Sequence, residues 1–376
     1  MLNLTEEQIA VRDTFARFTD AEIIPAAEAI DEAHEYPRDM VKRLADLGFV
    51  GMRYAEEVGG SGVDLVTCCL ALEEVARGSM SVAACVTMQA LMGTKFLEML
   101  GGEDIRERLF KPALSLDKIG AICMTEPNAG SDLGSISTRA VEADGGYILN
   151  GAKTWVTSAP VADFFTVFAR AGAEDKLTVF LVEKDFDGLV IGRPIEKMGV
   201  WALPTSEVAF NDCFLPDSHC LSAEIGDGEE HLRKLLSEIR IVTAVLGLGI
   251  ARAALDEAVR YAGERKQFGK PINRFQAVQM RLADMATDVE AARHITYHAA
   301  ALLDAGVPHR KEASMAKLFA TEAAARVCDN AARIFASYGY AMEYPVQRFL
   351  RDVRFTLIGG GTSDILKLVI AKELSV

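Results

Sequence analysis

The sequence predicts an α+β fold in three parts: an N-terminal helical domain, a central antiparallel β-barrel or sandwich domain, and a C-terminal four-helix bundle. Apolar residues recur at helical spacing before residue 120 and after residue 228, whereas the segments between are short and rich in β-branched and aromatic residues. No G-x-G-x-x-G motif follows a predicted strand, so an alternating dinucleotide-binding fold has no support. We therefore expect domains at residues 1–120, 121–228 and 229–376.

The N-terminal domain is predicted from capping and spacing signals. Thr5 and Gln8 are spaced as a helix-capping pair, and residues 9–24 carry an apolar stripe at roughly helical spacing. A Gly-rich turn at 58–62 interrupts the pattern, which resumes through 70–100.

The change of periodicity near residue 120 predicts the other two domains. Strands are expected where β-branched and aromatic residues gather, at 147–151, 164–169, 177–182 and 207–210. Helices are expected over the long Ala- and Leu-rich stretches at about 231–263, 272–304, 309–337 and 361–374.

The composition is that of a soluble globular protein. Half of the 376 residues are hydrophobic, and the formal net charge is −14. This acidity argues against a nucleic-acid partner, because a phosphate backbone requires clustered Lys and Arg. No apolar run approaches the ~18 residues of a membrane span, and residues 1–8 lack the pattern of an export signal. We expect a cytoplasmic protein.

The cysteines and histidines give no metal motif. None of the seven cysteines forms a C-x-x-C pair, and free thiols fit a reducing cytosol. His294 and His298 lie four apart on a predicted helix and could share a face, as metal ligands do. No acidic residue of an H-E-x-x-H motif lies between them, so we interpret both as helix-surface residues and expect no metal.

Three segments carry candidate chemistry, each with a plainer alternative. The hydroxyls, glycines and free N–H groups of 122–134 suit a phosphate or a heteroaromatic edge, or form a polar surface turn. Trp155 and Thr157, two apart on one strand face, suit a planar cofactor, or are a core Trp and an incidental Thr. The cations of 264–270 suit a diphosphate, or complement a helix C-terminus.

In their order and spacing these segments resemble the acyl-CoA dehydrogenase family along nearly the whole chain. Residues 123–134 resemble the family's first signature, and Asn150–Thr157 its flavin strand. Further motifs match at Lys197–Gly199 with Phe210–Asp212, Arg265–Gly269, Glu343–Val346 with Arg351-Asp352, and Gly361–Ser363.

The resemblance implies FAD between the β domain and the bundle, with Thr125 and Thr157 bonded to the isoalloxazine, Trp155 beside it and Ser131 at the diphosphate. Arg265, Gln267 and Phe268 would reach the FAD of a neighbouring subunit. The full set of cofactor contacts that it implies is Met124, Thr125, Gly130, Ser131, Trp155, Thr157, Arg265, Gln267, Phe268, Arg333, Ser337, Thr362 and Asp364.

The resemblance also implies an acyl-CoA substrate, an electron-transfer flavoprotein as electron acceptor, and a homotetramer built as a dimer of dimers. Arg240 takes the place of an arginine that lines the thioester pocket, and Ser131, Ile239 and Gly360 complete the implied substrate contacts.

The family's catalytic base is missing from both of its usual positions. In most members a Glu precedes the Gly-Thr of the C-terminal loop, where this chain has Gly360; in a second group a Glu precedes the bundle arginine, where this chain has Ile239. A positioned base contributes about 10²–10⁴-fold to such a reaction. Neither usual base is present in this chain.

Three explanations stay open. Glu238 could serve as a substitute base, although one residue is a rotation of about 100° on a helix. Asp364 could serve, although its position normally faces the cofactor. Otherwise the enzyme abstracts no α-proton: it oxidises elsewhere, runs as an enoyl-CoA reductase, or eliminates a group such as sulfinate or carboxylate, as in a lyase or desulfinase. A non-catalytic flavoprotein subunit is the remaining alternative.

Smaller departures accompany the missing base. The backbone N–H of Gly360 can still hydrogen-bond the thioester oxygen and stabilise charge that develops there. Arg333, Ala336 and Ser337 stand where many members have Gln and a Gly-Gly pair. Trp201 and Leu203 replace an Arg and a Ser, which predicts a more apolar pocket edge.

Overall fold

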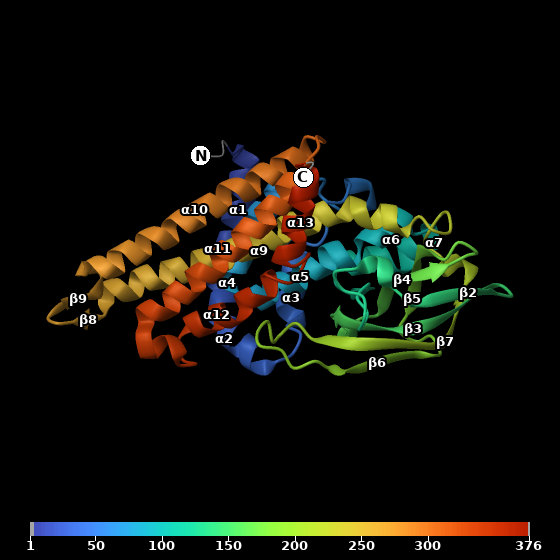
Figure 1. Cartoon of the computed structure of the whole chain (residues 1–376), viewed down its shortest axis with the longest axis horizontal. Helices are drawn as coiled ribbons and strands as arrows, with labels where there is room; N and C mark the ends of the chain where they lie inside the picture. The colour runs from blue at the N-terminus through green and yellow to red at the C-terminus, as the bar shows by residue number, and fades with distance from the viewer. Residues whose placement is uncertain (1–3, 375–376) are drawn as a thin grey trace.

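The computed structural model describes residues 4–374. Long helices run through most of the molecule, and a curled β-sheet occupies one end (Figure 1). The predicted three-part α+β fold is confirmed. The structure differs from the prediction by one additional helix in the C-terminal part and by two parallel strand pairings in the sheet.

The N-terminal helices begin where the capping signal predicts. Thr5 Oγ1 accepts a hydrogen bond from the Gln8 N–H at 3.2 Å, and Gln8 Oε1 accepts one from the Thr5 N–H at 3.1 Å. The α-helices of this part are α1 (Glu6–Phe18), α2 (Ile24–Ala33), α3 (Arg38–Asp46), α4 (Leu65–Gly78), α5 (Met80–Thr87), α6 (Lys95–Leu100), α7 (Glu103–Ile105) and α8 (Lys111–Leu114).

One apolar stretch was underestimated from the sequence. Met80–Leu100 is long and apolar enough to cross a membrane, contrary to the expectation that no run approaches this length. In the structure 83% of its most apolar window is buried, and a π-helical segment at Met88–Gly93 joins α5 to α6. It is a core segment of the helical body, and burial among other helices explains its composition.

The sheet is mixed. Its strands are β1 (Gly120–Cys123), β2 (Arg139–Ala143), β3 (Gly146–Thr157), β4 (Phe164–Ala171), β5 (Lys176–Glu183), β6 (Leu189–Pro194) and β7 (Thr205–Pro216). Their order is β1-β4-β2-β3-β7-β6, with β5 paired to β4. The wholly antiparallel sheet that we expected is wrong at two pairings: β4 runs parallel to β1 and meets β2 in parallel. These strands are distant in sequence, and periodicity does not report how such strands pair.

The C-terminal part contains five helices rather than four. They are α9 (Gly228–Glu264), α10 (Gln276–Asp304), α11 (Arg310–Phe335), α12 (Pro345–Thr356) and α13 (Ser363–Glu373). The short strands β8 (Lys266–Gln267) and β9 (Lys270–Pro271) form a hairpin between α9 and α10, at the far end of the molecule from the sheet (Figure 1). Helix α12 was not predicted.

Two hydrophobic cores hold the protein together. One is shared by the N-terminal and C-terminal helices, from Phe15 to Val353, and the other lies within the sheet around Phe165 and Phe180. Helix α9 packs against α4 and α11, so the two helical parts form one body. The α12–α13 loop is thereby fixed against α9 and α11.

Candidate active site

The loop between α12 and α13 places the two usual base positions side by side. A Cβ atom on Gly360 would lie 3.4 Å from Ile239 Cγ2 and 3.1 Å from Thr243 Oγ1, both on α9. Gly360 has a φ of +72°, which favours glycine. Thr362 ends the loop as the N-cap of α13, where its hydroxyl accepts from the Ile365 N–H at 3.4 Å. Position 360, position 239 and α9 therefore meet at one place.

Glu238 is held away from that place by an ion pair. Its Oε1 lies 3.2 Å from Arg53 Nε, and Arg53 also pairs with Asp304 at 3.3 Å. Glu238 and Val242, one turn apart on α9, line a small pocket together with apolar side chains that include Tyr54 and Leu91. Its carboxylate thus points to the N-terminal helices.

Asp364 is exposed at the start of α13. Its side chain is 89% exposed and pairs with Lys367 at 3.1 Å. A carboxylate in this setting remains solvated, which does not favour a base poised against a weakly acidic carbon.

Two buried cations lie behind the loop. Lys317, on α11, is fully buried and donates from Nζ to the carbonyl oxygen of Gly361 at 2.7 Å. Burial lowers the pKa of Lys317, Glu322 opposes this shift and the charge of Arg240 adds to it, and the resulting pKa is about 8. Arg240 is also buried, and burial lowers the pKa of its guanidinium as well. Sequence reasoning missed Lys317, since one lysine in a long helix carries no signal.

The segments 122–134 and 150–157 come together on the sheet. The Thr154 N–H donates to the Thr125 carbonyl oxygen at 2.9 Å, and Lys153 Nζ donates to the Met124 carbonyl oxygen at 3.2 Å. A Cβ on Gly130 would be 3.9 Å from Thr125 Cγ2, so this glycine also lies beside Thr125. The sequence predicted the segments but not how they are joined.

Trp155 sits in a β-bulge of β3. Its φ is +56°, and the β3–β7 register shifts between Lys153 and Val156. The bulge interrupts the strict alternation that we used to put Trp155 and Thr157 on one face. The Trp155 indole is 56% exposed, Thr125 and Thr157 are half-buried, and Ser131 is exposed on the 122–134 loop. An uncovered indole next to two hydroxyls suits a planar, hydrogen-bonding ring system.

A buried ion pair that we did not single out holds this arrangement. Lys153 Nζ lies 2.8 Å from Glu126 Oε1, and both side chains are almost fully buried. Glu126 also accepts from the N–H groups of Ser137 and Thr138, at 2.7 and 2.9 Å. Burial alone would raise the pKa of Glu126, but hydrogen bonds from Lys153, Ser137 and Thr138 outweigh it and bring the pKa to about 2. Glu126 lies in the 123–134 motif and Lys153 in the 150–157 motif, so membership of these motifs was the sequence signal that could have identified them.

The residues expected to reach a neighbouring subunit lie at the opposite end. Phe268 is 93% exposed at the tip of the β8–β9 hairpin, next to exposed Gln267. The Arg265 guanidinium lies 5.4 Å from the centre of the Tyr338 ring. Exposed Arg333, paired with Asp329 at 2.6 Å, and exposed Ser337 belong to the same part of the chain. Within one chain none of these meets Trp155.

Two further motifs meet at a tight backbone crossing. A Cβ on Gly199 would lie 2.6 Å from the carbonyl carbon of Arg351, and Asp352 Oδ1 accepts from the Val200 N–H at 2.6 Å. The Trp201 ring stacks under the Arg351 guanidinium at 3.7 Å. Trp201, which stands where many family members have Arg, thus packs at the junction between the 199–201 segment and α12.

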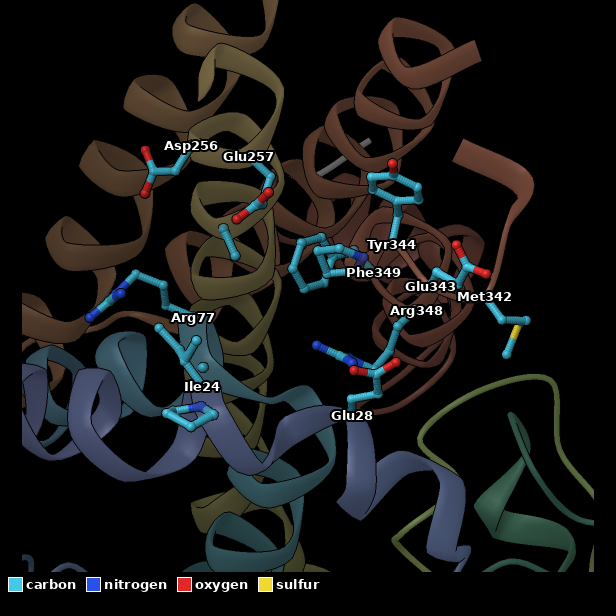
Figure 2. A pocket seen from close by; sticks show the side chains of 14 residues that line it. Ile24, Glu28, Arg77, Asp256, Glu257, Met342, Glu343, Tyr344, Arg348 and Phe349 are labelled. Carbon is cyan, nitrogen blue, oxygen red and sulfur yellow. The ribbon is translucent and has the colours of Figure 1, made fainter. Parts of the chain in front are cut away.

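A more open pocket lies elsewhere. It is formed by α2, α4, α9 and α12, and Figure 2 shows Arg77, Asp256 and Arg348 among the charged side chains around it. It contains none of the predicted site residues. His294 pairs with Glu290 at 3.1 Å on α10, and over residues 4–374 no cluster of three potential metal ligands occurs.

Comparison with known proteins identifies the family. The acyl-CoA dehydrogenase N-terminal, middle and C-terminal domains match residues 5–117, 121–213 and 226–375. A benzylmalonyl-CoA dehydrogenase of Aromatoleum aromaticum is 71% identical, over 99% of each chain. A glutaryl-coenzyme A dehydrogenase in complex with glutaryl-CoA has a TM-score of 0.96 and 34% identity, covering 100% of this chain and 97% of its own.

FAD is the cofactor of this family, and a solved FAD complex shares the fold. That complex, of PigA, has a TM-score of 0.95 and 28% identity, and covers 100% of this chain and 99% of its own. The exposed indole of Trp155 and the half-buried Thr125 and Thr157, on segments joined by a backbone hydrogen bond, offer the ring face and hydroxyls that an isoalloxazine would need. The chain belongs to the acyl-CoA dehydrogenase family of FAD-dependent oxidoreductases.

Proposed function

We propose that this enzyme oxidises a benzylmalonyl-type CoA thioester with loss of CO₂, giving an α,β-unsaturated aryl thioester. The observation that carries this proposal is the meeting of Gly360 and Ile239 at one place without a carboxylate on either. The 71% identity to a benzylmalonyl-CoA dehydrogenase supports the substrate class.

The chemistry of a malonyl thioester removes the need for a base. A benzylmalonyl group carries a carboxylate on the same carbon as the thioester, and breaking that C–C bond leaves an electron pair on the α-carbon. No proton has to be abstracted. The pair forms the new C=C bond as hydride leaves the β-carbon, and the negative charge of the carboxylate ends on the reduced cofactor. Substrate and FAD thus give unsaturated thioester, CO₂ and reduced FAD, with atoms and charge balanced.

The chain's own residues bind the cofactor, orient the substrate and polarise its thioester. Bound FAD supplies the hydride acceptor. Thr125, Thr157 and Trp155 hold and cover its ring, and the N–H of Gly360 bonds the thioester oxygen, where it stabilises the enolate charge by a few kcal/mol on oxyanion-hole precedent. Lys317 fixes the loop through the carbonyl oxygen of Gly361.

The aryl group has an apolar pocket within reach of the same helix. Val242 lines it from α9, one turn from the Ile239 and Thr243 side chains that adjoin Gly360, and Tyr54 and Leu91 line it from the N-terminal helices. An aromatic ring binds favourably in such an apolar, aromatic-lined site. Glu238, paired with Arg53 at the edge of this pocket, is not needed as a base.

The remaining implications of the family are also proposals. We infer that electrons pass to an electron-transfer flavoprotein and that the enzyme is a homotetramer in which Phe268 reaches a neighbour's FAD. All seven cysteines are free and six are buried, which supports a reducing, cytoplasmic setting.

Product analysis tests the proposal. Benzylmalonyl-CoA labelled with ¹³C in its free carboxylate is incubated with holoenzyme and a one-electron dye. We expect labelled CO₂, cinnamoyl-CoA and two reducing equivalents in a 1:1:2 ratio. An unsaturated product that keeps the label would overturn the decarboxylation, and CO₂ without dye reduction would indicate the lyase instead.

A further inference from the structure

Arg240 is a buried cation that lacks a carboxylate partner in the part of the chain the structure describes. It is only 6% exposed, and its one hydrogen bond runs from Nη1 to Ser314 Oγ at 3.2 Å. Its Nε is buried and has no hydrogen-bond partner. A buried charge is costly unless it is paired.

Several other buried charges of this protein are paired with an opposite charge. Lys153 pairs with Glu126 at 2.8 Å, Arg351 with Asp31 at 2.6 Å, and Glu73 with Arg293 at 3.0 Å. Among the described residues, Lys317 shares with Arg240 the lack of a paired carboxylate, and it lies beside the same loop. A guanidinium with a free donor in a buried site is suited to a carboxylate, which it binds in a planar, bidentate geometry.

The position of Arg240 points to the acyl group. It follows Ile239, whose side chain would touch a Cβ on Gly360. Its partner Ser314 lies on α11 one turn before Lys317, which donates to the Gly361 carbonyl oxygen. Arg240, Lys317 and the Gly360-Gly361 segment thus form one cluster at the junction of α9, α11 and the α12–α13 loop.

We propose that Arg240 binds the α-carboxylate of the substrate and orients it for loss as CO₂. This inference rests on the proposed function and deepens it. The usual family members carry a protein carboxylate at position 360 or 239; here the substrate's carboxylate takes that place beside the guanidinium. Held there, the C–COO⁻ bond can stand across the plane of the thioester, so that its electron pair enters the enolate as CO₂ leaves. The positive charge then faces the enolate.

Binding of two unreactive thioesters tests Arg240. Malonyl-CoA and acetyl-CoA differ only in the carboxylate, and neither has a β-carbon to oxidise. Their Kd values are measured on FAD-loaded enzyme at pH 7 by stopped-flow flavin absorbance, within the first seconds after mixing. We expect wild type to prefer malonyl-CoA by about 10- to 100-fold, in line with hydrogen bonds between charged groups.

Two variants and one control decide the outcome. In Arg240→Met we expect the ratio of the two Kd values to fall to about one, while the Kd of acetyl-CoA changes less than about twofold. A merely structural role would not produce this combination. Arg240→Lys should restore part of the preference for malonyl-CoA. Arg326→Met, which removes an exposed α11 cation paired with Asp288, leaves the preference unchanged. If Arg240→Met does not fold, a preference undiminished in Arg240→Lys contradicts the proposal.

The failure of this inference can be told from failure of the proposed function. A wild-type enzyme that shows no preference for malonyl-CoA, or an FAD-loaded Arg240→Met enzyme that keeps it, overturns the role of Arg240. Either result leaves the labelled-CO₂ experiment intact, because that experiment asks only whether the carboxylate is lost.

Discussion

On the proposed function, the residue at position 360 determines whether the protein or the substrate supplies the negative charge beside Arg240. Gly360→Glu would place a carboxylate where the substrate's own is proposed to bind, and two like charges in a buried site repel strongly. We expect the KM of benzylmalonyl-CoA to be at least about tenfold higher in Gly360→Glu than in Gly360→Gln.

The glutamine variant is the matched control. Both side chains share the strain of a φ of +72° and the close contact with Thr243, so the difference between them isolates charge. Equal KM values in steady-state assays at pH 7 would argue against a substrate carboxylate at this position. A gain of straight-chain acyl-CoA dehydrogenation in the Glu variant would show that the loop can still present a base.

Glu238 offers the second test at the residue scale. If its carboxylate only pairs with Arg53, Glu238→Gln keeps one hydrogen bond to the guanidinium, and Asp304 keeps the charge balanced. We expect kcat for benzylmalonyl-CoA to fall less than about tenfold, against the 10²–10⁴-fold loss that removal of a general base produces. A loss of a hundredfold or more in a folded, FAD-loaded variant would reinstate Glu238 as a base.

At the scale of elements, the Glu126–Lys153 pair fastens the 122–134 loop to β3. The folded-state pKa of Glu126 is about 2, against about 4.5 ordinarily, so the unfolded chain binds more protons between these values. Ionised Glu126 therefore contributes about 3 kcal/mol to the free energy of unfolding above pH 4.5, and this contribution is lost as the pH falls toward 2.

Urea unfolding at two pH values checks this sign. The stability advantage of wild type over Glu126→Gln should shrink by about 2 kcal/mol between pH 5 and pH 3. Lys153→Met should also be destabilising at pH 7, by about 3–5 kcal/mol, because it leaves the buried Glu126 carboxylate without its paired charge. An advantage that does not change with pH would show that Glu126 titrates normally in the folded protein.

The same elements show what the sequence could predict. Helices α9, α10 and α11 and strands β3, β4 and β5 follow from apolar periodicity, because each buries one stripe or face over many residues. Helix α12 is short and follows an irregular turn, and the bulge at Trp155 depends on pairing with β7. Neither feature produces a periodic apolar pattern in the sequence. The parallel β1–β4 pairing is a contact between distant segments.

For the candidate site, motif spacing predicts that Gly360 and Ile239 stand at the two usual base positions and predicts which residues face the flavin; both stay predictions. The sequence does not show that the two positions touch, that Glu238 pairs with Arg53, or that Arg240 lacks a carboxylate partner among residues 4–374, because these are properties of packing between α9, α11 and the α12–α13 loop. Only the folded chain shows them.

At the scale of the whole molecule, the exposed hairpin tip is the place where we propose that a partner subunit binds. Phe268 is 93% exposed in the single chain and is proposed to cover a neighbour's FAD. Phe268→Ala should weaken FAD binding by about tenfold, the value of one aromatic contact, without lowering the stability of the chain itself. Tyr340→Ala, which removes an equally exposed ring, should leave FAD binding unchanged. FAD release on dilution, followed by fluorescence and sedimentation, measures both; equal effects would contradict the subunit contact.

The most direct measurement compares two thioesters that differ only in the carboxylate. Anaerobic stopped-flow mixing of holoenzyme with benzylmalonyl-CoA should bleach the flavin rapidly. The same experiment with 3-phenylpropionyl-CoA should bleach it at least about 10²-fold more slowly, because we propose that no side chain serves as the base that would remove its α-proton. Equal rates for the two thioesters would contradict the account, since they would reveal a working base that neither Gly360 nor Ile239 provides.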